Sequence, residues 1–226
     1  GATWDQITYS DSDVSASKSI KVANDETRAL SMETDFAYGL GDFGTPFDNP
    51  LIFSAGLFST IQEAIDFAPV GSTINVEPGI YYEALSINKS LTLLGPGITD
   101  ELNLATINSE CSQTVGIMAS NVIISGFDMT EDGCNSETVV YIGTNLQDVT
   151  ITENIIRDGY YGVYTNGSAN TIIQNNEIMY NTYGIYLTGD INGSQITGNN
   201  IHDNGEGISV SGATFNTFSI TNNQVV

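Results

Sequence analysis

The sequence predicts an all-β protein made of stacked coils, a parallel β-helix, and two observations carry this prediction. Apolar and polar residues alternate in short segments such as Val149-Thr-Ile151 and Ile185-Tyr-Leu187, which is typical of strands. One coil cannot bury its own apolar face, so a repeat of 22–27 residues indicates units that stack on one another. The repeat is carried by Ile124, Ile151, Ile173, Ile196 and Ile220.

An asparagine follows each of the last four of these isoleucines by three residues. These residues are Asn154, Asn176, Asn199 and Asn223. Neighbouring rungs of such a coil lie ~4.8 Å apart, so equivalent side chains stack directly on one another. Asparagine tolerates the left-handed backbone of a tight turn, and its amide can bond the amides above and below. We therefore interpret the four residues as a structural ladder.

Eight residues after each of the first three ladder asparagines comes a glycine followed by an apolar residue. These segments are Gly162-Val-Tyr164, Gly184-Ile-Tyr186 and Gly207-Ile-Ser209. They resemble the right-handed β-helix repeats of pectin-active enzymes, carbohydrate-binding and sugar-hydrolase domains, NosD-type periplasmic proteins and microbial cell-surface or sheath proteins. The resemblance covers about residues 58–226 and implies a right-handed solenoid. It leaves the function open, because one fold hosts many chemistries.

Two regions precede the repeats. Residues 1–57 show no repeat but include many apolar residues, from Trp4 to Phe53, which is unusual for a solvated tail. This irregular N-terminal arm is expected to pack either on its own β-helix or on a neighbouring subunit. The β-helix domain, residues 58–226, is expected to begin with a capping helix over residues 60–68.

The expected helix has clear start and stop signals. Thr60 and Glu63 form the pattern of a capping box, and Pro69 follows the last helical residue. Its apolar face would cover the end of the first coil.

The chain reaches Val226 in mid-coil, directly after the asparagine turn. An open rung exposes an apolar core slice and unpaired backbone groups, so it normally requires a cap. Either a partner subunit covers this rung or the protein is longer. We predict a homo-oligomer or polymer that forms through the C-terminal rung and the N-terminal arm.

Cys111 and Cys134 are 23 residues apart, which is one coil. Residues on adjacent rungs have Cα atoms ~4.8 Å apart, within the range of a disulfide. We predict a bridge between coils, which favours an oxidising compartment. The alternative is two buried free thiols. The single distant His202 makes a metal site with these cysteines the weaker interpretation.

The composition excludes several classes of function. Twenty-seven acidic and five basic residues give a net charge of −22, which disfavours nucleic acid and anionic membranes as partners. No apolar run is long enough for a membrane span. No cofactor is predicted, although Ca²⁺ is a candidate for bridging the acidic surfaces.

Two further features point to export. The chain begins at Gly1 without a methionine, as expected if a signal peptide has been removed. Three Asn-X-Ser sequons make Asn88, Asn166 and Asn192 candidates for glycosylation. We expect an extracellular or cell-surface protein.

Two sets of side chains are candidates for contact with glycans. Asp158 and Asp203 lie two predicted rungs apart, ~9.6 Å, a separation that suits an inverting glycosidase, with Tyr180 on the rung between them. Turn chemistry is the competing explanation for both. Tyr141, Tyr164 and Tyr186 are expected to stack as an aromatic strip that either contacts sugars or stiffens the sheet.

The preferred functional hypothesis is a non-catalytic extracellular building block of a surface layer, sheath or filament. Only five basic residues are available to bind an acidic polysaccharide, and they do not cluster in the repeats. The alternatives are a polysaccharide-active lyase or hydrolase, which would need clustered carboxylates, and a glycan-binding module.

Overall fold

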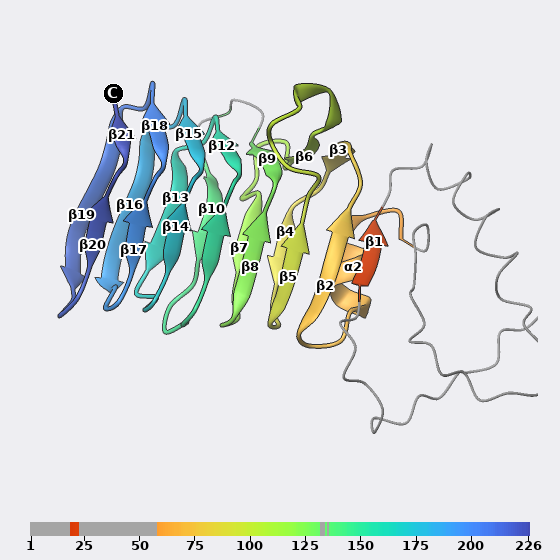
Figure 1. Cartoon of the computed structure of the whole chain (residues 1–226), viewed down its shortest axis with the longest axis horizontal. Helices are drawn as coiled ribbons and strands as arrows, with labels where there is room; N and C mark the ends of the chain where they lie inside the picture. Colours follow the sequence, from red (N-terminus) through yellow and green to blue (C-terminus); the bar gives the residue numbers. More distant parts are fainter. Residues whose placement is uncertain (1–18, 23–57, 132–133, 135) are drawn as a thin grey trace, which may run out of the picture.

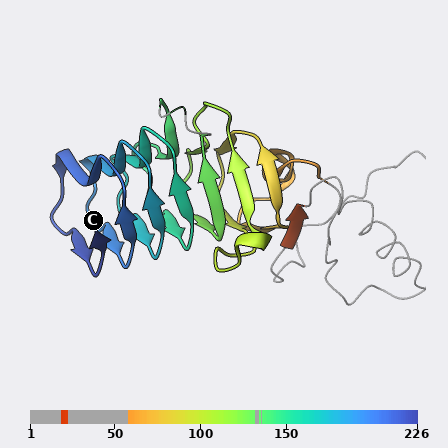
Figure 2. The same cartoon turned by 90° about the horizontal axis from the view of Figure 1, so that it is seen from above.

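The computed structural model describes residues 19–22, 58–131, 134 and 136–226. They form an all-parallel β-solenoid of about seven turns, so the fold predicted from the repeat is confirmed. Figure 1 shows the coils stacked along the long axis, with α2 (Ile61–Phe67) near one end and β19–β21 at the other. Seen from above in Figure 2, the successive coils follow one another in the same order.

Three parallel sheets run along the solenoid, and each complete coil adds one strand to each sheet. Sheet A contains β1 (Ser19–Val22), β2 (Ser72–Val76), β5 (Leu91–Leu94), β8 (Val122–Ser125), β11 (Thr150–Thr152), β14 (Ile172–Gln174), β17 (Gln195–Thr197) and β20 (Ser219–Thr221). Sheet B contains β3 (Gly79–Tyr82), β6 (Ala105–Asn108), β9 (Phe127–Thr130), β12 (Ile155–Arg157), β15 (Glu177–Met179), β18 (Asn200–His202) and β21 (Gln224–Val225). Sheet C contains β4 (Leu85–Ile87), β7 (Val115–Ile117), β10 (Thr138–Ile142), β13 (Tyr161–Asn166), β16 (Tyr183–Asp190) and β19 (Glu206–Thr214). A short 3₁₀ helix, η1 (Glu101–Asn103), lies between β5 and β6.

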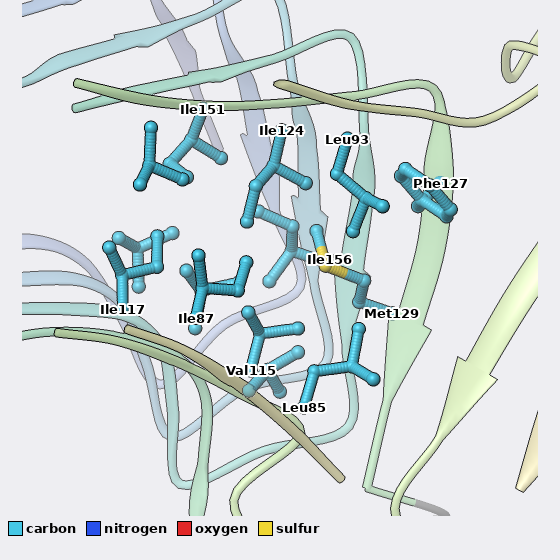
Figure 3. Packing of buried hydrophobic residues seen from close by; sticks show 14 of the residues in the cluster. Leu85, Ile87, Leu93, Val115, Ile117, Ile124, Phe127, Met129, Ile151 and Ile156 are labelled. Carbon is cyan, nitrogen blue, oxygen red and sulfur yellow. The ribbon is translucent and has the colours of Figure 1, made fainter. Parts of the chain in front are cut away.

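The repeated isoleucines form one inward column of sheet A. The strand register aligns Ile124 with Ile151, Ile151 with Ile173, and Ile173 with Ile196. All four are at most 1% exposed and belong to the central core, part of which Figure 3 shows. Burying one such side chain contributes roughly 1.5–3 kcal/mol, so each coil is stabilised mainly by the coils next to it.

The asparagine ladder is a continuous column of hydrogen bonds. The side-chain oxygen of each ladder asparagine accepts from the backbone N–H of the equivalent residue one coil earlier: Asn154 from Phe127, Asn176 from Asn154, and Asn199 from Asn176. The amide nitrogens continue the column, since Asn176 donates to Asn199, and Asn199 to Asn223. Buried polar groups that are fully bonded in this way fix the corner between sheets A and B.

The left-handed backbone expected at the ladder asparagines lies one residue earlier. Positive φ angles occur at Glu153, Asn175, Gly198 and Asn222, each directly before a ladder asparagine. The ladder asparagines themselves lie with their amides turned inward, and the first three are at most 2% exposed. The residue before each of them therefore makes the sharp turn.

A second ladder, not found in the sequence, lies at the corner between sheets B and C. Asn181 accepts from the backbone N–H of Gly159 at 2.9 Å and donates its amide to Asn204 at 3.1 Å. Asn204 in turn accepts from the backbone N–H of Asn181. Asn181 and Asn204 each follow an asparagine of the first ladder by five residues, and this spacing was the available signal.

The helix α2 covers the first coil as expected. Thr60 is its N-cap and accepts from the backbone N–H of Glu63, while Ile61, Ala64 and Ile65 are fully buried. The carboxylate of Glu83 accepts from the backbone N–H groups of Ile61 and Gln62 at 2.8 and 2.9 Å. A carboxylate at this end of the helix satisfies N–H groups that have no partner within the helix.

The opposite end of the helix is closed by a cation. Lys89 donates from Nζ to the carbonyl oxygens of Asp66 and Ala68, the position where a positive charge is favourable. Long-range contacts thus hold both ends of α2 against the coil that follows.

One segment of the N-terminal arm lies in the described residues. β1 pairs in parallel with β2 and aligns Ile20 with Ile74, so it extends sheet A by one strand. The other interpretations of the arm, from Trp4 to Phe53, lie outside the described residues.

The last rung carries exposed apolar side chains. Ile220 and Val225 are 45% and 53% exposed, whereas Ile196 and Ile201 at the same register are at most 1% exposed. A further layer on this rung would bury the same columns.

Candidate functional sites on the coil surface

The outer face of sheet C carries six clustered tyrosines. Tyr141, Tyr164 and Tyr186 stand in register on β10, β13 and β16, with successive ring centroids 5.5 and 5.7 Å apart. Tyr161 and Tyr183 form a second stacked pair at 5.3 Å, and the ring of Tyr161 lies 5.1 and 5.0 Å from those of Tyr164 and Tyr186. Tyr160 adds an edge-on ring 4.7 Å from that of Tyr161. We call this set, Tyr141, Tyr160, Tyr161, Tyr164, Tyr183 and Tyr186, the tyrosine platform.

The sequence pattern explains how two columns of tyrosine fit on one face. Val163 and Ile185 are fully buried, so Tyr164 and Tyr186 point outward by strand alternation. Gly162 lies between Tyr161 and Val163, and a Cβ on it would stand 2.6 Å from the carbonyl oxygen of Gly184. Glycine is therefore required at this close approach of successive coils, and the platform forms beside this contact.

The tyrosine platform presents aromatic rings and neutral hydroxyl groups. Tyr160 is 37% exposed and the other five rings are half-buried. Desolvation raises the pKa of Tyr161, and the negative charge of Glu206 raises that of Tyr183. These hydroxyls therefore stay protonated in neutral solution and can donate hydrogen bonds. Such a surface combines ring faces with polar groups, which suits either packing within the sheet or contact with a polar ligand.

The two candidate catalytic carboxylates are separately engaged. Asp158 binds Nη1 of Arg157 at 2.6 Å, and Arg157 also binds Asp128 through Nε and Nη2, each at 2.9 Å. Asp203 instead bonds Nδ1 of His202 at 2.8 Å. Both aspartates have positive φ angles. This backbone conformation identifies both aspartates as turn residues.

One further rung lies between the rungs that carry the two aspartates. The register of sheet B runs from Arg157 through Met179 to His202, and Tyr180, which is 53% exposed, follows Met179. The structure thus places Asp158 and Asp203 two rungs apart, Asp158 paired with Arg157 and Asp203 hydrogen-bonded to His202. Each carboxylate is therefore held by a neighbour of its own.

His202 lies between two carboxylates. Its Nδ1 contacts Asp203 and its Nε2 contacts Glu177 at 3.2 Å. These hydrogen bonds, that with Asp203 first, raise the pKa of His202 above its ordinary value of 6.5. Among the described residues no group of three or more His, Cys, Asp and Glu side chains is arranged to hold a metal ion.

The predicted disulfide is present. Cys111 and Cys134 are bonded, with their Cα atoms 5.4 Å apart and one coil between them in sequence. The loop that holds Cys134 is also fixed by Glu131, a fully buried carboxylate that accepts from the backbone N–H groups of Ser136 and Glu137. The bridge thus ties Cys134 to the preceding coil, and the carboxylate holds the segment that enters β10.

The three sequons have different surroundings. Asn88 is exposed directly after β4, and Asn166 is the half-buried last residue of β13. Asn192 lies in a turn, where its side-chain oxygen accepts from the backbone N–H groups of Asn216 and Thr217.

Comparison with known families identifies the repeat. A family model described as "Right handed beta helix region" matches residues 105–226, more than half of the chain. The chain belongs to this family. The right-handed β-helix implied by the resemblance to β-helix repeat proteins is thereby confirmed.

The chain is similar to several known proteins. A protein named "Cell surface glycoprotein" from Methanothermus fervidus is 34% identical over an alignment of 169 residues, which covers 58% of this chain and 27% of the relative. The β-helix chain thus spans about a quarter of that relative's length. Among solved structures, ORF18 of Geobacillus virus E2 shares the fold, with a TM-score of 0.58 and 16% identity over 74% of this chain and 38% of its own.

A pectin methylesterase from carrot also aligns, with 13% identity over 89% of this chain and 66% of its own. Its TM-score of 0.41 is too low to support an inference about this chain. Within the described residues, no helix is long and apolar enough to cross a membrane. The surface relative and the disulfide are consistent with an extracellular or surface location.

Proposed function

We propose that this β-helix is a non-catalytic structural unit of an extracellular surface protein. The similarity to the cell surface glycoprotein of Methanothermus fervidus carries the proposal, because it links this sequence to a surface protein at 34% identity. The disulfide agrees with it, since disulfides persist in oxidising compartments.

The physical properties of the stack support a mechanical role. The coils are joined by three parallel sheets, two asparagine ladders and a continuous apolar core. Stability in such a stack is a sum of contacts between neighbouring coils, so a longer chain of coils remains rigid without a second core. A rod of this kind suits a surface layer, sheath or filament.

Assembly is proposed to use the two ends of the stack. β1 adds to the outer edge of β2, and β20 offers the opposite free edge of sheet A at the other end. A β1 segment from a second molecule can pair with β20 through the same parallel hydrogen bonds, which gives a head-to-tail contact. Two different surfaces that match each other produce a filament or sheet unless the rotation closes a ring.

The acidic composition predicts how assembly depends on ions. Molecules with a net charge of −22 repel one another, and salt screens this repulsion. Ca²⁺ would in addition bridge carboxylates of adjacent molecules. We therefore expect larger assemblies in electron micrographs at high protein concentration with salt and Ca²⁺ than without them.

Two variants test the proposed contact. Deleting residues 1–50 removes the β1 segment, and Ile220→Pro removes a backbone donor from the terminal strand β20. Both should give monomers in light scattering while circular dichroism shows an intact β-helix. Ile123→Ser is a control for the loss of an exposed isoleucine, because Ile123 is 39% exposed, against 45% for Ile220, but lies on β8 in the interior of sheet A, away from both ends of the stack. Native protein that stays monomeric in salt and Ca²⁺ would contradict the assembly.

A further inference from the structure

The three sequons differ in what stands two residues before the asparagine. Tyr164 precedes Asn166 at this spacing, whereas Ser86 precedes Asn88 and Asp190 precedes Asn192. Two residues along a strand bring a side chain back to the same face, ~6.6 Å further on. Asn166 therefore stands on the outer face of sheet C, next in line to the tyrosine platform.

The surroundings of Asn166 place its amide at the border of that platform. Thr188 of β16 pairs with Asn166, and its hydroxyl donates to the side-chain oxygen of Asn166 at 3.3 Å. In the described residues the Nδ2 group of Asn166 makes no hydrogen bond. The side chain is thus oriented through its oxygen, while the nitrogen that a glycan would use is left available.

The neighbouring strand completes an aromatic surface beside this nitrogen. Tyr186 pairs with Tyr164, and Thr188 follows Tyr186 by two residues as Asn166 follows Tyr164. A sugar linked to Asn166 therefore lies next to two rings whose centroids are 5.7 Å apart. The C–H groups of a pyranose carry partial positive charge and pack favourably on the negative face of such rings.

We propose that Asn166 carries an N-linked glycan and that its first sugars pack on Tyr164 and Tyr186 of the tyrosine platform. In the linking step, Nδ2 bonds to the anomeric carbon of a glycosyl donor with a phosphate leaving group. The bond from that carbon to the phosphate oxygen breaks, and Nδ2 releases one proton. The transfer requires the glycosylation machinery of the exporting cell.

The charge of the surroundings selects the class of sugar. Glu206 pairs with Tyr183 and stands at the edge of the tyrosine platform in a chain of net charge −22. Acidic sugars are disfavoured beside this carboxylate and in the field of the acidic chain, so the sugars that contact the rings are neutral hexoses. The protonated hydroxyls of the platform then supply hydrogen-bond donors to them.

This inference rests on the proposed surface location but not on assembly. Protein isolated from the surface of the cells that make it should show a glycan on the peptide that contains Asn166 when digested and examined by mass spectrometry. Asn166→Gln, expressed in the same cells, should lose that glycan. Asn192→Gln is the matched control, because the side chain of Asn192 faces a turn formed by Asn216 and Thr217.

The packing is measured by nitration with tetranitromethane, which modifies accessible tyrosines. Removing the glycan with Asn166→Gln should raise nitration of Tyr164 and Tyr186 several-fold relative to Tyr82, which is 65% exposed and lies on a different sheet. Asn192→Gln should leave these rates unchanged. Equal melting temperatures of the native protein and both variants show that the change is local, and Asn166→Asp replaces Asn166→Gln if glutamine unfolds the coil.

Three results would overturn the proposal. The first is an unmodified Asn166 in native protein that carries a glycan at Asn88 or Asn192. The second is a glycosylated Asn166 with equal nitration of Tyr164 with and without the sugar. The third is an unmodified Asn166 together with binding of released envelope glycan to the unmodified protein, which would assign the tyrosine platform to a neighbour's glycan. Failure of the surface location itself would instead appear as native protein found only inside the cell.

Discussion

Asn176→Ala tests whether the asparagine ladder holds the coils together. Asn176 is 2% exposed and makes four side-chain hydrogen bonds. Its oxygen accepts from the backbone N–H and the side-chain amide of Asn154, and its nitrogen donates to the carbonyl oxygen of Ile151 and the side-chain oxygen of Asn199. Alanine removes all four hydrogen bonds, and its side chain can make none to replace them.

The magnitude follows from which groups keep a partner. The side-chain amide of Asn154 still donates to Ile124 and Thr152, and the oxygen of Asn199 still accepts from the backbone N–H of residue 176. The backbone N–H of Asn154 loses its partner in a fully buried position, which costs ~1–3 kcal/mol. With ~1 kcal/mol for the bond to Ile151, we expect a loss of about 2–4 kcal/mol from a total stability of ~5–15 kcal/mol.

Asn223→Ala is the matched comparison. Asn223 makes the same contacts to Asn199 and Ile196, but it stands half-buried on the last rung, where water reaches the released groups. Its loss should cost about 1 kcal/mol or less. Urea denaturation followed by circular dichroism should show a much lower midpoint for Asn176→Ala than for Asn223→Ala. Equal midpoints for the two variants would refute the reasoning.

Three further predictions concern single sites. Ile173→Asp puts a charge at an inward position that is 1% exposed, so cooperative melting in circular dichroism should be lost; a melt like that of the native chain would mean that this position tolerates water. His202 is the only histidine, and its raised pKa stabilises the fold below pH 6.5, an effect that is lost as the pH rises through the folded value. Asp203→Asn should move the NMR titration of this imidazole toward 6.5, and an unchanged pKa would contradict the assigned cause. Asp158→Asn should leave fold and assembly intact because Arg157 keeps its contacts to Asp128; loss of a polysaccharide-cleaving activity measured on the native protein would overturn the non-catalytic proposal.

The sequence predicted those features that repeat with the coil. Ile173 and Asn176 stand at fixed offsets in every unit, and strand spacing alone then places equivalent residues in contact. The bond between Cys111 and Cys134 followed from the same arithmetic. A periodic fold converts sequence offset into distance, which is why these contacts could be read without a structure.

Contacts that break the repeat could not be predicted. Glu83 reaches the start of α2, and Lys89 reaches its end, through loops whose paths have no period. The ring of Tyr161 lies 5.1 Å from that of Tyr164 on the same face, whereas strict alternation along β13 would put it on the side of Val163. The sequence therefore predicted only three of the six rings of the tyrosine platform.

The outer faces of sheets B and C carry different polar groups. On its outer side, sheet B carries the ion pair of Arg157 with Asp128 and the contact of His202 with Glu177, so polar side chains join its neighbouring coils. The outer side of sheet C instead carries the tyrosine platform, which salt does not screen. High salt should therefore weaken the charged contacts on the outer side of sheet B and leave the ring contacts on the outer side of sheet C unchanged. A solenoid built in this way keeps one ion-insensitive face, and that face ends at Asn166.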